Sequence, residues 1–197
     1  LAFDLAFKYR NPAIILADGV IGQMMEKVVL PEQRPRLTNE EVMARCPWAT
    51  FGKLKHRGPN IVTSLELDPA EMEKRNIHLQ QKYAEIEEKE VRYEEIHCDD
   101  AEYLIVAFGS CARIAQEGIK VGLLRPITLW PFPSKAIAER SRQVKGILTV
   151  ELNAGQMVED VRLAVECKVP VEYFGRLGGI VPDPDEVVTA LKEKIIK

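Results

Sequence analysis

The chain has 197 residues, of which 46% are hydrophobic and 29% are charged, and its formal net charge at pH 7 is −3. This composition is typical of a globular protein and excludes a strongly basic surface, so we expect no nucleic-acid partner. No uninterrupted apolar stretch approaches the roughly 20 residues that a membrane-spanning helix needs, so we expect no membrane association.

The first 30 residues predict a helix, a strand and a loop in that order. The amphipathic stretch 1–10 reads as a helix already under way, not as a signal peptide, and we expect the true N-terminus to lie elsewhere. The helix should end near Asn11-Pro12, and the apolar run 13–17 fits a strand buried on both faces. The turn signal Asp18-Gly19 then ends this strand.

Residues 31–98 predict a connector that contains one long helix. Pro, Arg and Lys without clear periodicity dominate its first half. Asp68 followed by Pro69 and Glu71 is typical of a helix N-terminus. The apolar positions that follow form one narrow stripe, so this helix should pack by one edge: Met72, Leu79, Tyr83 and Ile86.

From residue 99 onward, strands and helices alternate, which predicts a largely parallel sheet with helices on both faces. The expected strands are 103–108, 119–124, 147–151 and 169–173, and the expected helices begin near Gly109, Ser134, Gln156 and Asp183. The predicted fold class is therefore α/β, a three-layer α/β/α sandwich. Only about ten residues separate the first two strands, fewer than a parallel crossover usually needs, so we expect residues to be missing between Glu117 and Gly118.

Catalytic and metal-binding patterns are weak. The turn after the first of these strands, residues 109–113, has one glycine where a dinucleotide site needs G-x-G-x-x-G. Ala17-Asp18-Gly19 partly resembles the Gly-Asp-Gly of thiamine diphosphate sites, but no Asn pair follows at the right distance. The three histidines stand alone in polar contexts, and we assign no catalytic residue and no metal ligand. They are His56, His78 and His97.

The four cysteines have no short CxxC-like spacing, so they predict neither an iron–sulfur site nor a disulfide framework in this chain. They are Cys46, Cys98, Cys111 and Cys167. We expect reduced thiols and a cytoplasmic location.

The loop 18–26 leaves the end of an expected strand, where open α/β sheets place their ligands. Its two glycines allow close backbone approach, and its two methionines supply adaptable apolar surface. We single out Asp18, Gly19, Gln23 and Met24 as an active-site-proximal loop. The alternative is a structural turn whose methionines lie in a core or a subunit interface.

Two further loops follow strands and are expected at one edge of the sheet. They contain Asn153, Gln156, Arg176, Gly178 and Gly179, which are candidates for interface or anion contacts. The alternative is that the glycines only shape the loops and that Arg176 pairs with an acid across an interface.

Four motifs resemble alpha subunits of 2-oxoacid:ferredoxin oxidoreductases, and they occur in the same order there. They are NPAIILADGVIGQMME at 11–26, LRPITLWPFP at 124–133, VELNAGQMVEDVR at 150–162 and GRLGG at 175–179. The resemblance is closest to the branched-chain type, which oxidises 3-methyl-2-oxobutanoate (2-ketoisovalerate).

The resemblance implies part of an enzyme that converts a 2-oxoacid, coenzyme A and oxidised ferredoxin into acyl-CoA, carbon dioxide and reduced ferredoxin. Thiamine diphosphate and Mg²⁺ would act in the intact complex, at a site mostly outside this chain. Iron–sulfur clusters would lie in partner subunits, and coenzyme A would be a cosubstrate. The implied partners are a beta subunit, a ferredoxin-like gamma subunit and ferredoxin, in a homo- or hetero-oligomer.

The resemblance also implies three parts. Residues 1–30 would be the end of a pyrimidine-binding domain, and residues 31–98 would be a connector with the long helix. Residues 99–197 would form a transketolase C-terminal-like domain. Such a fragment would serve assembly and be inactive alone. Two alternatives stay open: a non-catalytic α/β assembly module, or the C-terminal part of another, transketolase-like thiamine enzyme.

Overall fold

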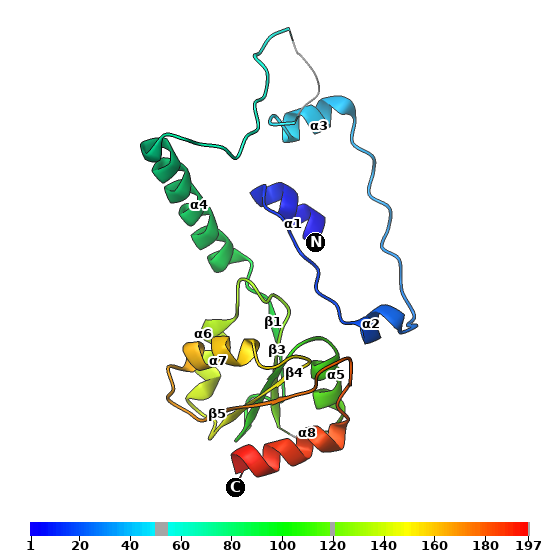
Figure 1. Cartoon of the computed structure of the whole chain (residues 1–197). Helices are drawn as coiled ribbons and strands as arrows, with labels where there is room; N and C mark the ends of the chain where they lie inside the picture. Colours follow the sequence, from blue (N-terminus) through cyan, green and yellow to red (C-terminus); the bar gives the residue numbers. More distant parts are fainter. Residues whose placement is uncertain (50–54, 119–120, 197) are drawn as a thin grey trace. The chain divides into compact units, whose positions relative to one another are not determined.

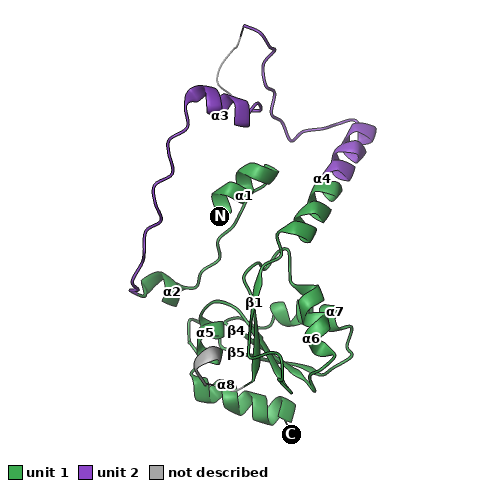
Figure 2. Ribbon diagram, turned by 180° about the vertical axis from the view of Figure 1, so that it is seen from behind, with its two compact units in different colours: residues 1–24, 80–197 green, residues 25–79 purple. Residues whose placement is uncertain are grey.

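A computed structural model describes residues 1–49, 55–118 and 121–196. The chain forms two compact units, which are coloured separately in Figure 2. The first unit comprises Leu1–Met24 and Gln80–Lys197, and the second comprises Met25–Leu79. In the described parts of the chain, no helix combines the length and the apolar character needed to cross a membrane. The predicted division into three parts remains a prediction.

Five strands form one sheet in the order β1-β3-β2-β4-β5 (Figure 1). The strands are β1 (Tyr93–Ile96), β2 (Leu104–Ala107), β3 (Gly122–Pro126), β4 (Ile147–Glu151) and β5 (Val171–Gly175). The last four run parallel to one another, and β1 pairs antiparallel with β3 at one edge. The predicted, largely parallel sheet is confirmed. The central strands β2 and β4 are buried along their whole length. β2 is apolar throughout, and β4 buries Thr149 and Glu151 as well as three apolar residues.

Helices cover both faces of this sheet. One face carries α6 (Ser134–Ser141) and α7 (Met157–Val165). The other carries α5 (Gly109–Gly118) and α8 (Pro184–Leu191), which continues as the π-helix η1 (Lys192–Ile196). Alternate residues of β2 enter the two cores: Leu104 and Val106 join one, and Ile105 and Ala107 join the other. The three-layer α/β/α fold class is confirmed.

The remaining helices are α1 (Ala2–Tyr9), α2 (Gly19–Gln23), α3 (Asn39–Arg45) and α4 (Pro69–Lys89). As predicted, Asp68 caps α4, because its Oδ1 accepts hydrogen bonds from the backbone N–H groups of Ala70 and Glu71 at 2.8 and 3.3 Å. The stripe on α4 is also confirmed: Ile86 is buried and the other three positions are partly buried.

The strand predicted at 13–17 is wrong for this chain. Residues 12–18 form neither helix nor strand, and the side chains of Ile14, Ile15 and Leu16 are 80%, 77% and 70% exposed. The reason is that a strand needs a neighbour, and no strand of the described chain pairs with this run.

Smaller differences have local causes. Pro170 has no N–H to donate, and β5 begins after it at Val171, two residues later than predicted. The helix α6 starts at Ser134, but Pro133 occupies the N-cap position and no side chain caps it. Sequence reading missed β1, since an edge strand with mostly exposed residues lacks an apolar signal.

The ten-residue helix α5 joins β2 to β3, and Glu117 and Gly118 lie in its last turn. Residues 119–120, where the second strand was expected to begin, lie outside the described residues. Missing residues between Glu117 and Gly118 remain a prediction.

Candidate functional site

Three segments of the first unit meet at the carboxyl edge of the sheet, where β2 and β4 end side by side. They line a hollow of about 200 Å³ formed by Leu16, Ala17, Asp18, Ile21, Phe108, Gly109, Cys111, Glu151, Leu152 and Asn153. An adjoining hollow of about 150 Å³ is lined by Phe108, Leu129, Phe132, Glu151, Asn153, Gln156, Met157 and Asp160. Both are smaller than the roughly 300–1,000 Å³ typical of small-molecule sites.

Asp18 links the N-terminal segment to this edge. Its Oδ1 accepts hydrogen bonds from the backbone N–H groups of Val20 and Ile21, both at 2.9 Å, and thereby caps α2. Its Oδ2 accepts a hydrogen bond from Ser110 Oγ at 2.8 Å. Burial raises the pKa of Asp18, but the hydrogen bonds from Ile21, Ser110 and Val20 outweigh it, and the net pKa lies below its usual value. Asp18 is therefore a carboxylate at neutral pH.

Glu151 is a buried acid that sequence reading missed. Its side chain belongs to β4 and is 1% exposed. Its carboxylate accepts three backbone hydrogen bonds at the N-terminus of α7, from Gln156 at 3.2 Å, Met157 at 2.8 Å and Val158 at 3.0 Å. N–H groups in this position commonly bind anionic ligands. Here the chain's own carboxylate uses them. The available signal was a charged residue closing an apolar strand just before a helix.

The loops after β4 and β5 follow adjacent parallel strands and lie at one edge, as expected. Asn153 accepts a hydrogen bond from the backbone N–H of Gly155 at 2.7 Å, and Gln156 is exposed at the N-cap of α7. Arg176 forms an ion pair with Glu186 of α8, within the chain. The anion and interface roles of this set remain predictions.

The other predicted residues are exposed or serve backbone geometry. Gly178 and Gly179 have φ of +65° and +85°, in the left-handed region that favours glycine. Gly19 and Gln23 belong to α2 and are exposed, and Met24 is 48% exposed. Neither Gln23 nor Met24 lines either hollow. The proximity of this loop to an active site remains a prediction.

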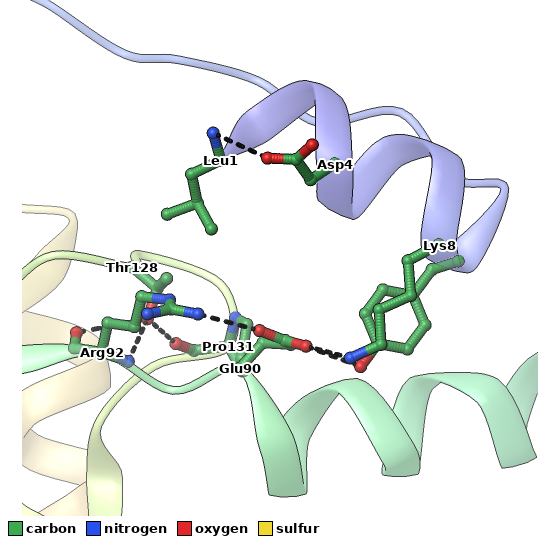
Figure 3. Close-up of polar contacts among 8 residues, drawn as sticks. Leu1, Asp4, Lys8, Glu90, Arg92, Thr128 and Pro131 are labelled. Carbon is green, nitrogen blue, oxygen red and sulfur yellow. Dashed lines mark hydrogen bonds and ion pairs between the residues drawn. The ribbon is translucent and has the colours of Figure 1, made fainter. Parts of the chain in front are cut away.

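A second buried acid, Glu90, holds α1 against the end of α4 (Figure 3). Glu90 is 6% exposed and accepts hydrogen bonds from Lys8 Nζ and Tyr9 OH, each at 2.7 Å, and from Arg92 Nη2 at 3.2 Å. The hydrogen bonds from Lys8 and Tyr9 lower the pKa of Glu90 to about 2. The N-terminal segment therefore meets the rest of its unit at Glu90 as well as at Ser110.

These residues do not fit a thiamine diphosphate and metal site. Within residues 1–49, 55–118 and 121–196, no three His, Cys, Asp or Glu side chains are placed to hold a metal ion. The oxygens of Asp18 and Glu151 already accept hydrogen bonds from the chain itself. The arrangement is suited to holding segments of the chain together.

Comparison with known proteins identifies related sequences. Residues 101–187 match the family model described as pyruvate:ferredoxin oxidoreductase core domain II. The chain is 44% identical over 200 residues to ketoisovalerate oxidoreductase subunit VorB of Methanothermobacter marburgensis, covering 98% of this chain and 55% of that protein. It is 31% identical over 193 residues to 2-oxoglutarate synthase subunit KorA of Archaeoglobus fulgidus, covering 92% of this chain and 53% of that protein. The chain spans about half the length of these relatives.

The fold resembles that of a solved structure, a 2-oxoglutarate:ferredoxin oxidoreductase from Magnetococcus marinus. The TM-score is 0.52 at 21% sequence identity, over 72% of this chain and 26% of that chain. At this identity the match establishes the fold alone. The sequence similarities are thus to subunits of ketoisovalerate oxidoreductase and 2-oxoglutarate synthase.

Proposed function

We propose that this chain is part of the alpha subunit of a 2-oxoacid:ferredoxin oxidoreductase that acts on branched 2-oxoacids. One observation carries the proposal: 44% identity to a ketoisovalerate oxidoreductase subunit along 98% of the chain. Identity to the 2-oxoglutarate synthase subunit is 31%, which favours 3-methyl-2-oxobutanoate as the substrate. The reaction would yield acyl-CoA, carbon dioxide and reduced ferredoxin.

This chain would serve mainly in the assembly of the complex, and the chemistry would take place elsewhere in the complex. Both hollows at the carboxyl edge are small, and Asp18 and Glu151 bind the chain's own N–H and O–H groups. Thiamine diphosphate and Mg²⁺ would bind mostly outside this chain, and coenzyme A would enter as cosubstrate. A beta subunit and a ferredoxin-like gamma subunit would supply the cofactor site and the iron–sulfur clusters, with ferredoxin as electron acceptor.

Residues 1–30 would end a preceding pyrimidine-binding domain, with residues 31–98 as connector and residues 99–197 as the assembly domain. The exposed apolar run 13–17 supports this division, because its composition suits a strand buried on both faces while its backbone is unpaired here. In the whole subunit it would pair with neighbouring strands. Amide hydrogen exchange should then be slow for residues 14–16 in the intact complex and fast in the isolated chain.

Co-purification from the native cell tests the proposal. A tag on the native subunit should recover its partners, and the complex should reduce a viologen dye fastest with 3-methyl-2-oxobutanoate plus coenzyme A. Faster reduction with 2-oxoglutarate or pyruvate would overturn the proposed substrate. If no 2-oxoacid gave coenzyme A-dependent reduction, the proposed oxidoreductase activity would be wrong. If the chain freed of other proteins bound thiamine diphosphate and decarboxylated a 2-oxoacid, the assembly role would be wrong.

A further inference from the structure

The segment 10–17 connects two polar anchors. Just before it, Lys8 and Tyr9 donate hydrogen bonds to Glu90; just after it, Asp18 accepts a hydrogen bond from Ser110. Between these anchors, residues 12–17 are exposed and have no regular structure. The position of α2 therefore depends strongly on the second anchor.

The helix α2 has five residues, far fewer than the roughly 12–15 that an isolated helix needs in water. Its order must come from docking. Ile21 contributes apolar contact, because it is partly buried and lines the larger hollow beside Phe108 and Cys111. Asp18 contributes the polar contact, and one carboxylate serves both roles: Oδ1 caps α2, and Oδ2 reaches α5.

The contact on α5 lies where an α/β protein commonly binds an anionic ligand. Gly109 has a φ of +58° at the first turn of α5, and a Cβ at this position would lie 3.6 Å from Asp18 Oδ2. The hydroxyl of Ser110 donates a hydrogen bond to the Asp18 carboxylate at 2.8 Å. The Ser110 hydroxyl thus holds the carboxylate at the N-terminus of α5, where the helix dipole favours negative charge.

We propose that Asp18 is a latch: by placing its carboxylate on the N-terminus of α5, it fixes residues 19–24 to the carboxyl edge of the sheet. Asp18 is a positioning residue in this role. The latch is a property of the chain itself. Its consequence for turnover, through the exposed Gln23 and Met24, rests on the proposed function.

Hydrogen–deuterium exchange of the full chain tests the latch. The reporters are the amides of Gly22 and Met24, which donate to the carbonyls of Asp18 at 3.1 Å and Val20 at 3.0 Å. Ser110→Ala removes the hydroxyl donor and leaves the cap of α2 intact. Because a hydrogen bond to a charged group is lost, the exchange rate of both amides should rise about tenfold. Asp18→Ala should abolish their protection, and Ser110→Thr should restore it to near the wild-type level.

Asp183→Ala is the matched control. Asp183 caps α8 with the same kind of bond, Oδ1 to the backbone N–H of Glu186 at 2.9 Å. The control should speed exchange in the first turn of α8 and leave Gly22 and Met24 unchanged. The latch is overturned if Ser110→Ala and Asp18→Ala, with native circular dichroism, change both reporters less than twofold. It is also overturned if Asp183→Ala accelerates them as much as Ser110→Ala does.

The exchange assay contains no substrate, cofactor or partner. Failure of the latch with normal viologen reduction would leave the proposed function standing. A working latch without any 2-oxoacid oxidation would refute the proposed function alone. In the active complex, Ser110→Ala should lower kcat several-fold and change KM for the 2-oxoacid much less. Ser110→Thr should restore kcat.

Discussion

Replacing Glu151 with glutamine should destabilise the domain although the side chain barely changes shape. Oε2 accepts from Gln156 and Met157, and Oε1 accepts from Val158. Glutamine keeps one acceptor oxygen, but an NH₂ group replaces the other. This NH₂ group cannot accept a hydrogen bond, so at least one backbone N–H would face another donor. The variant thus loses one or two hydrogen bonds to a charged acceptor, each contributing about 1.5–3 kcal/mol. We expect a loss of about 2–4 kcal/mol in the free energy of unfolding.

Urea denaturation followed by circular dichroism measures this loss as a lower midpoint at unchanged slope. Glu159→Gln is the matched control, since Glu159 lies in the first turn of the same helix but is exposed. This control should change the free energy of unfolding by less than about 0.5 kcal/mol. If the two variants were equally stable, the buried carboxylate would not hold α7, and the reasoning would be refuted.

Three further predictions concern other residues. Because the folded-state pKa of Glu90 is about 2, below its ordinary value of 4.5, its contribution to stability should be full above about pH 4.5 and lost toward pH 2. Glu90→Gln should flatten that part of a plot of Tm against pH. In the intact complex, Gln23→Ala should lower kcat/KM several-fold, and Gln156→Ala should change it less than twofold; equal effects would remove the reason for singling out that loop. Burial and nearby carboxylates raise the pKa of Cys111 to about 11, so iodoacetamide should modify it at least tenfold more slowly than exposed Cys167, as mass spectrometry would show.

Local sequence signals determined the elements whose causes are local. The strand β2 is a continuous apolar run, as expected of a strand buried on both faces, and β4 is apolar at three of its five positions. Asp68 and Asp183 cap helices through bonds to residues two or three positions away, so the pattern alone predicts them. The four family motifs likewise lie in the sequence, and the similarity to oxidoreductase subunits agrees with them.

Only the tertiary structure decided features that join distant residues. Ser110 lies 92 positions from Asp18, and Glu90 lies 82 positions from Lys8, so no periodicity or spacing relates them. The same reason explains the wrong strand at 13–17: composition shows that a segment suits a buried strand, but pairing depends on a neighbour that the fold must bring beside it. The sequence by itself predicted most of the helices, the apolar strands and the family that the chain resembles, but it missed the short helices α2 and α3 in segments expected to be loop and connector. The packing of the chain decided which carboxylates are buried and which backbone groups they hold, because burial and long-range hydrogen bonds exist only once distant segments meet.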